Sequence, residues 1–293
     1  MLYDIGLTFS TAYANPVSVA RHLLRLVPAD LAGAQTLHSG RLDVTPAPLG
    51  RSRFTDFFGN SATEIALRAP HDEITVRMEA RVDRFADPGL DLSPDRAGLA
   101  REIAAFRGLG PDAPHHFLGA SPRIAPAPDM TAYAREMSDG GLTAFGTVCA
   151  VGMALHRDMK FDPEATNVET PPAEAFARRH GVCQDFAQVM IAGLRGIGVP
   201  AGYVSGFLRT NPPPGKPRLE GADAMHAWVR AWCGVETGWV EFDPTNATVC
   251  ATDHVVVAYG RDYGDVSPMR GVLRISGGQK IDQKVDVIPV GGP

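Results

Sequence analysis

The first third of the chain alternates apolar and polar residues, which is the pattern of β-strands with one buried face. Residues 3–9 alternate with a period of two, and so do residues 74–82, whose apolar positions all fall on one face. A turn-like segment at 69–72 separates this second run from a shorter one at 64–67. Such alternation suits a sheet that packs one face against a core, so residues 1–86 are predicted to form an all-β, sandwich-like N-terminal domain.

The pattern then changes to helical spacing and later returns to strands. Ser93-Pro94 is typical of an N-cap followed by proline, and Thr170-Pro171 repeats the signal before a short helix that Gly181 terminates. Further helices are predicted at 129–138 and 142–157, and strands at 202–208, 226–232, 238–243, 254–259, 269–275 and 284–290. Helices followed by a run of strands predict an α+β fold for this part of the chain.

Length and composition fit a soluble protein of two domains. We divide the 293 residues into 1–86 and 87–293, the second domain including the C-terminal strands. The chain is 44% hydrophobic and 21% charged, and its net charge of -5 offers no basic surface for nucleic acid. The N-terminus lacks the regions of a signal peptide, and no window holds the roughly 20 apolar residues of a membrane span. Neither nucleic acid nor a membrane is therefore expected as a partner.

Four scattered cysteines indicate a reducing compartment. They show no metal-ligand spacing and occupy positions Cys149, Cys183, Cys233 and Cys250. Free thiols fit a cytoplasmic location better than a disulfide framework does. A zinc site built from Cys183, His226 and Asp243 is chemically conceivable but lacks the close ligand pairs of structural zinc sites. We therefore expect neither a metal nor another cofactor.

Cys183 lies at the predicted start of a helix. Apolar residues within 186–197 recur at helical spacing, and Gly198 with Pro200 supplies the stop. In the first turn the helix dipole favours an anion, and the thiolate is the nucleophilic form of cysteine. Free backbone N–H groups of that turn can also bind a developing oxyanion. Cys183 is therefore predicted to be a nucleophile rather than a small buried hydrophobe, and Asp185 is expected to stabilise the helix start.

His226 and Asp243 fall on two alternating segments that a short turn can join. Residues 226–232 and 238–243 alternate, and the residues between them can form a hairpin. A turn centred between Gly234 and Val235 places His226 directly opposite Asp243 on the same face. Cross-strand neighbours have Cβ atoms about 4.5–5.5 Å apart, so the carboxylate can orient an imidazolium. These two residues are predicted to be a base and its orienting acid; a bulge would shift the register by one residue.

Several segments, taken in order, resemble the bacterial transglutaminase-like superfamily. They are GVCQDFA (181–187), GVPAGYVSG (198–206), HAWV (226–229) and WVEFDPTN (239–246). DFFGN (56–60) resembles the β-rich N-terminal domain of bacterial members, and AYGRDYGDVSP (258–268) resembles their closing strands. The resemblance implies a papain-like core, in which a helix that carries the cysteine packs on an antiparallel sheet. The nucleophile, base and acid of the family match Cys183, His226 and Asp243.

We therefore expect a cysteine-dependent enzyme that acts through a thioester on a peptide or carboxamide bond of a peptide or protein substrate. A peptidase or amidase is favoured, because no recognisable protein-docking module accompanies the core. The alternatives are a protein-glutamine transglutaminase or amide ligase with an amine acceptor, and a non-catalytic binding module that retains the fold. The Pro-rich loop 210–221 is a candidate lid or substrate gate, with a passive surface connection as the alternative. The oligomeric state stays open.

Overall fold

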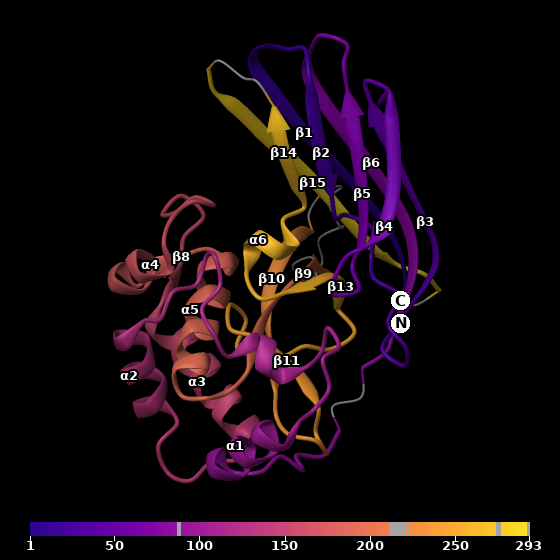
Figure 1. Ribbon diagram of the computed structural model, residues 1–293. Helices are drawn as coiled ribbons and strands as arrows, with labels where there is room; N and C mark the ends of the chain where they lie inside the picture. Colours follow the sequence, from indigo (N-terminus) through magenta and orange to yellow (C-terminus); the bar gives the residue numbers. More distant parts are fainter. Residues whose placement is uncertain (87–88, 211–220, 222, 274–276, 292–293) are drawn as a thin grey trace, which may run out of the picture.

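A β-sandwich lies beside a mixed helical and β-sheet core in the computed structural model (Figure 1). The structure describes residues 1–293 except 87–88, 211–220, 222, 274–276 and 292–293. Two four-stranded antiparallel sheets, ordered β15-β1-β6-β3 and β14-β2-β5-β4, form the sandwich. Its N-terminal strands are β1 (Leu2–Val17), β2 (Ala20–Leu24), β3 (Gln35–Thr45), β4 (Gly50–Thr55), β5 (Ser61–Leu67) and β6 (His71–Arg84).

The two C-terminal strands complete this sandwich. β14 (Met269–Leu273) pairs with β2, and β15 (Gln279–Pro289) pairs with β1 along an unbroken antiparallel register. The sequence-based division had assigned both strands to the second domain, 87–293, but their hydrogen bonds place them in the sheets of the N-terminal sandwich. The cause is the chain path: β15 pairs with β1 along its whole length, and the side chains of Val285 and Val287 are buried there.

The core consists of one five-stranded antiparallel sheet and the helices that cover it. The strand order is β12-β11-β10-β9-β13, and α5 packs on β9 and β10. The sheet comprises β9 (Ala201–Leu208), β10 (Ala224–Trp232), β11 (Trp239–Asp243), β12 (Thr248–Val249) and β13 (His254–Gly260). The remaining elements are α1 (Arg96–Ala105), η1 (Pro114–Phe117), α2 (Pro128–Met137), α3 (Ala144–Asp158), β7 (Lys160–Phe161), α4 (Pro172–Arg178), β8 (His180–Gly181), α5 (Cys183–Gly196) and α6 (Tyr263–Val266).

This arrangement confirms the predicted fold class. A helix that begins at Cys183 packs on an antiparallel sheet, and an all-β sandwich precedes it. On β6 the alternation behaves as the sequence predicts, with Ile74, Val76 and Met78 buried and the residues between them more exposed. Of the helices described, none is long and apolar enough to cross a membrane.

Two helix boundaries differ from the prediction. Asp95, not Ser93, caps α1, because its carboxylate accepts the backbone N–H of Gly98 at 2.7 Å. The hydroxyl of Ser93 instead accepts the N–H of Phe145 in the first turn of α3, at 2.9 Å. The helix α4 ends before Gly181, since Arg179 adopts a left-handed conformation with φ of 57°. Gly181 therefore lies outside α4, in the short segment that leads to Cys183.

Buried side-chain amides join the sandwich to the core sheet along the edge strand β13. Gln35 donates through Nε2 to the carbonyl of Val256 at 2.8 Å and accepts the N–H of the same residue at 2.9 Å. Asn60 makes the equivalent pair of hydrogen bonds with the backbone of Tyr259, at 2.7 and 2.8 Å. Both amides thus act as a neighbouring strand would, because each one pairs with the N–H and the carbonyl of a single β13 residue.

Candidate active site

Cys183 is the first residue of α5, and Asp185 holds that helix start in place. The Oδ2 atom of Asp185 accepts the backbone N–H of Val182 at 2.8 Å and the hydroxyl of Thr166 at 2.5 Å. Gly181 makes this packing possible, because a Cβ atom there would lie 2.6 Å from Asp185 Oδ2. The predicted structural role of Asp185 is therefore confirmed. The side chain orients the turn in which Cys183 meets the positive end of the helix dipole.

The hairpin that carries His226 and Asp243 has a register two residues away from the predicted one. Val229 pairs with Phe242, so extension of the register places Asp243 opposite Trp228 rather than His226. The loop is wider than a tight turn, because the N–H of Cys233 donates to the carbonyl of Gly238 at 2.8 Å. A shift of two residues leaves every side chain on its original face.

His226 and Asp243 therefore still meet, but across a diagonal of the hairpin. The Nε2 atom of His226 lies 2.7 Å from Asp243 Oδ2. Diagonal neighbours on one face of a sheet are within reach of long or aromatic side chains. Both side chains are buried, and the carboxylate of Asp243 is fully inaccessible. The sequence thus predicted the correct pair from a register that is itself wrong.

Asp243 accepts hydrogen bonds on both carboxylate oxygens. Its Oδ1 atom binds the backbone N–H groups of Thr245 and Asn246, at 2.9 and 3.2 Å. Its Oδ2 atom binds His226, the side-chain amide of Asn246 at 2.7 Å, and His254 at 3.1 Å. Burial acts to raise the pKa of Asp243, but these hydrogen bonds and the charge of His226 hold it well below its ordinary value. The group is a carboxylate at neutral pH.

His226 lies between this carboxylate and Cys183. Burial acts to lower the pKa of His226, but the negative charge of Cys183, and the hydrogen bonds to Asp243 and Cys183, raise it from 6.5 to about 10. Because Nε2 faces Asp243, Nδ1 is the ring nitrogen left for the cysteine. An imidazole held in this way can carry a proton at neutral pH and deliver it to a leaving group.

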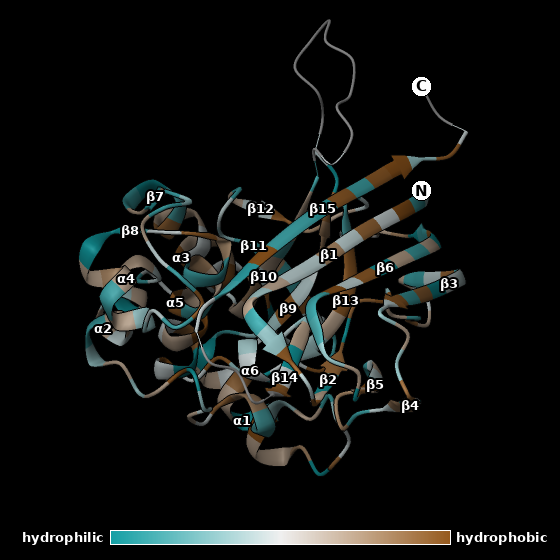
Figure 2. Ribbon diagram, turned by 90° about the horizontal axis from the view of Figure 1, so that it is seen from above, coloured by the Kyte–Doolittle hydropathy of each residue, from teal (hydrophilic) through white to brown (hydrophobic). Residues whose placement is uncertain are grey.

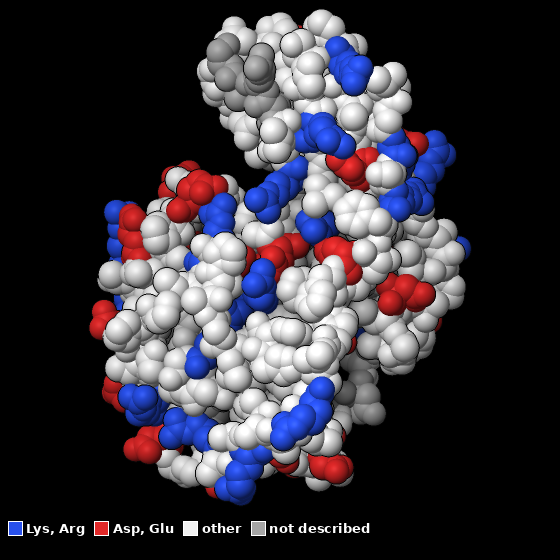
Figure 3. Space-filling model, viewed as in Figure 1, with Lys and Arg blue, Asp and Glu red and all other residues white. Residues whose placement is uncertain are grey.

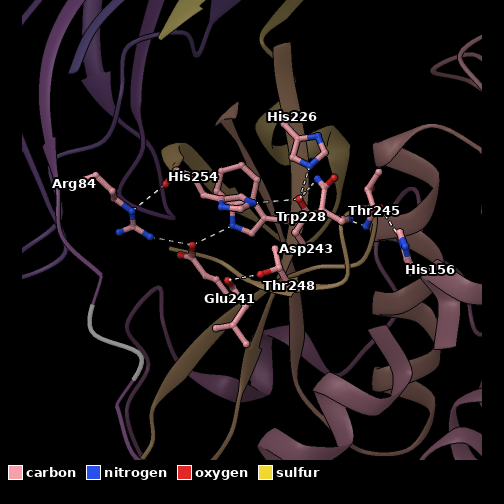
Figure 4. Close-up of polar contacts among 11 residues, drawn as sticks. Arg84, His156, His226, Trp228, Glu241, Asp243, Thr245, Thr248 and His254 are labelled. Atoms are coloured by element: carbon pink, nitrogen blue, oxygen red, sulfur yellow. Dashed lines mark hydrogen bonds and ion pairs between the residues drawn. The ribbon is translucent and has the colours of Figure 1, made fainter. Parts of the chain in front are cut away.

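His254 is a member of the cluster that sequence reasoning missed. Figure 4 shows His226 and His254 approaching Asp243 from different strands. The intervening strand β9 carries Gly206, where a Cβ atom would lie 2.3 Å from the indole of Trp228. Trp228 therefore lies across β9, and its ring meets His254 edge-on at 5.2 Å between centroids. Only the order of strands in the sheet brings His254 here, so local sequence offered no signal.

The sandwich also supports this cluster. Arg84, at the end of β6, donates to the backbone carbonyl of His254 at 2.9 Å and to Glu241 at 3.3 Å. The same carboxylate of Glu241 accepts the indole N–H of Trp228 at 3.0 Å. The indole of Trp228, which contacts the His254 ring, is thus held through Glu241 by a residue of the N-terminal domain (Figure 4).

One ligand atom from each of His226, Asp243 and His254 lies within 4.8 Å of the other two, which is the geometry of a possible metal centre. The donor chemistry favours hydrogen bonding instead. An ionised carboxylate only accepts, so both Nε2 atoms that face Oδ2 carry hydrogen and offer no lone pair to a metal. The sequence-based expectation of no metal remains a prediction.

Cys183 and His226 line a cleft of about 730 Å³ between the core and the sandwich. The sandwich contributes Phe9 of β1, Met269 of β14 and Ile281 of β15 to its walls. Figure 3 shows charged side chains of both signs gathered in the hollow between the two parts of the molecule. Of the predicted lid, 210–221, only the two end residues lie within the described part of the chain. The cleft gives a substrate access to the sulfur from the sandwich side.

The other three cysteines lie in surroundings that disfavour a thiolate. Burial raises the pKa of Cys149 to about 11 and holds the pKa values of Cys233 and Cys250 well above their ordinary range. All four thiols are free. None of these three lines the cleft, so Cys183 is the cysteine placed for chemistry.

Two family descriptions match separate parts of this chain. The bacterial transglutaminase-like N-terminal region matches residues 3–83, and the transglutaminase-like superfamily matches residues 131–244. An uncharacterised protein of Mycobacterium tuberculosis is 35% identical over 261 residues, which cover 86% of this chain and 82% of that protein. The chain belongs to the transglutaminase-like superfamily.

Two further matches describe the range of this superfamily. A protein-glutamine gamma-glutamyltransferase of Pseudomonas aeruginosa is 32% identical over 121 residues, which cover 38% of this chain and 18% of that protein. The crystal structure of a candidate cysteine protease from Cytophaga hutchinsonii superposes with a TM-score of 0.77 and 20% identity. That superposition covers 100% of this chain and 92% of the other, and it shows that the two share a transglutaminase-like fold.

Proposed function

We propose that this transglutaminase-like protein is a cysteine-dependent acyl-transfer enzyme with Cys183 as nucleophile, His226 as acid and base, and Asp243 as the orienting carboxylate. The observation that carries the proposal is the position of His226. The imidazole contacts a buried carboxylate through one nitrogen and faces the first residue of a helix in an open cleft with the other. That arrangement suits general acid–base catalysis beside a thiolate.

In the acylation step, the Cys183 thiolate bonds to the carbonyl carbon of a carboxamide or peptide group. The first-turn N–H groups stabilise the oxyanion. As the C–N bond breaks, the leaving ammonia or amine takes the proton of His226. In the second step His226 accepts a proton from water or an amine, whose oxygen or nitrogen bonds to the acyl carbon while the thioester C–S bond breaks. Cys183 returns as the thiolate, and no oxidant or reductant is consumed.

We favour water as the acceptor, which makes the protein a peptidase or amidase that acts on peptide or protein substrates. The similarity to a protein-glutamine gamma-glutamyltransferase supports a second candidate, transfer to an amine. A third candidate is not an enzyme: it is a binding module that retains the fold without catalysis. A cytoplasmic location stays a prediction.

Blocked glutamine peptides separate these candidates. We expect the protein to release ammonia from them or to cleave a peptide bond, and the Cys183→Ala and His226→Gln variants to lose at least a hundredfold of this rate. Added hydroxylamine distinguishes the acceptors, since a transferase forms a hydroxamate at the expense of the acid. Full turnover by Cys183→Ala on any substrate would end the proposal. A Cys183 no more reactive than an unfolded thiol, together with tight peptide binding, would favour the binding module.

A further inference from the structure

Among the described residues, one edge of strand β15 carries a single backbone bridge, at Val285. Its other edge pairs with β1 from Gln279 to Pro289 without a register shift. On the outer edge, which is the edge of β15 opposite β1, Asp223 forms an isolated antiparallel bridge with Val285. Among the described residues, no backbone partner covers the outer edge from 279 to 283. Residues 279–283 are also exposed. Figure 2 shows that this part of β15 is largely hydrophilic.

The direction of the backbone groups along this edge follows from the bridge. The carbonyl of Val285 accepts the N–H of Asp223 at 3.2 Å, and the N–H of Val287 donates to the Asp223 carboxylate at 2.6 Å. Amide groups of alternate residues in an antiparallel strand point to the same edge. The N–H and C=O groups of Gln279, Ile281 and Gln283 therefore point outward, whereas those of the residues between them bind β1.

The same three residues line the cleft that contains Cys183 and His226. An open strand edge is a template for an additional strand, and the bridge from Asp223 to Val285 shows that the same edge pairs with an antiparallel backbone at one position. At about 3.3 Å per residue, the open segment is roughly 16 Å long and matches five residues of an extended peptide.

We propose that the 279–283 edge of β15 binds the main chain of the acyl-donor peptide as an added β-strand and thereby guides its reacting carbonyl to Cys183. The proposal rests on the proposed function and narrows its substrate class. The preferred donor is an extended, unfolded segment of at least five residues, not a free amino acid amide or a glutamine inside a helix. Recognition is by main-chain hydrogen bonds, so it tolerates varied side chains.

Saturable labelling of Cys183 tests the proposal with a probe that contains little beyond a backbone. The probe is acetyl-pentaalanyl chloromethyl ketone, whose concentration dependence yields a binding constant, KI, and a maximal rate of alkylation. Iodoacetamide serves as a second reagent, because it alkylates the thiol but has no peptide backbone that could pair with β15. In Ile281→Pro the outward N–H is lost, while the β1-directed hydrogen bonds of its neighbours remain; a proline is tolerated in an edge strand at such a position. The matched control, Ile281→Ala, removes the side chain but keeps the N–H.

We expect Ile281→Pro to raise KI for the peptide probe about three- to tenfold, the contribution of one hydrogen bond. Ile281→Ala is expected to keep KI within about twofold, and iodoacetamide to label both variants at the wild-type rate. An unchanged KI in Ile281→Pro overturns the proposal. An equal rise in both variants also overturns it, because the contact is then with the side chain.

The two kinetic parameters, KI and the maximal rate of alkylation, separate docking of the peptide from the reactivity of Cys183. A low maximal rate of alkylation in the wild type counts against the proposed nucleophile, whereas a shift in KI reports docking alone. If Ile281→Pro does not fold, by circular dichroism, the wild type is tested with probes that carry one N-methyl group at successive residues. Strand addition predicts that KI rises at every second position, and a uniform response overturns it.

Discussion

His254 donates through Nε2 to Asp243 Oδ2 at 3.1 Å, the same oxygen that His226 contacts at 2.7 Å. Since the carboxylate can only accept, the Nε2 atom of His254 carries hydrogen. Within the described part of the chain its Nδ1 atom is buried without a hydrogen-bond partner, so a second proton there would be left unsatisfied. His254 thus acts as a hydrogen-bond donor that helps to fix the carboxylate, while His226 faces the cleft.

Replacement of His254 should reveal this donor. We expect His254→Phe to lose about 1–3 kcal/mol of unfolding free energy, because it leaves a buried carboxylate with one donor fewer. His254→Gln can place an amide N–H near the same point and is expected to lose less. Urea unfolding of the two variants measures the difference. Equal losses would show that His254 contributes packing against Trp228 and not a hydrogen bond.

Thiol reactivity should be concentrated at one cysteine. At pH 7 a thiol with the pKa of Cys149, about 11, is about one part in ten thousand thiolate, and burial also raises the pKa values of Cys233 and Cys250 well above their ordinary range. We expect iodoacetamide to label Cys183 first below pH 7, and His226→Ala to slow that labelling. Mass spectrometry of the digested protein locates the adducts. Faster labelling of Cys149 would contradict the arrangement.

The stability of the fold should depend on the ionisation of Asp243. Its folded pKa lies well below the unfolded value of about 3.8, so its contribution is complete above that value and is lost as the pH falls below it. From pH 4 downward, the wild type should lose up to about 1.4 kcal/mol of unfolding free energy per pH unit on this account. The side chain of Asp243→Asn does not ionise, so this pH-dependent part of the unfolding free energy is absent from the variant. The two proteins are compared by urea unfolding between pH 5 and pH 2.5, and parallel curves would refute the assignment.

The position of Cys183 should be sensitive to a single methyl group at Gly181. A Cβ atom there would lie 2.6–2.9 Å from the side chain of Asp185, and would displace the carboxylate that caps α5. We expect Gly181→Ala to cost about 1–2 kcal/mol, as the loss of a cap does, and to slow the alkylation of Cys183. Gly119→Ala is the control, since no atom lies within 4 Å of its Cβ position. Similar behaviour of the two variants would exclude the mechanism.

Much of the candidate site follows from local pattern. Helical spacing after Cys183 predicts the start of α5, because periodicity and the Gly198 stop are local properties. Alternation on β10 and β11 places His226 and Asp243 on one face for any register that differs by an even number of residues. The pair was therefore predictable even though the loop is wider than a tight turn.

Other features depend on residues that are distant in sequence. The first half of β15 consists of exposed residues with no alternation of burial, so the sequence predicted the strand only from residue 284. Its neighbour β1 supplies the hydrogen bonds that extend it. In the same way, the contact of His254 with Asp243 depends on the order of the core strands and on the absence of a side chain at Gly206, which leaves room for the Trp228 ring.

The sequence by itself determined the helix that begins at Cys183, the faces of β10 and β11, and the chemical identity of the cysteine, histidine and carboxylate, because these depend on neighbours a few residues away. The tertiary structure alone decided the diagonal contact between His226 and Asp243, the addition of His254, and the membership of β14 and β15 in the sandwich. The reason is physical: strand order and register are set by which apolar faces can be buried together, and that is a property of the whole chain.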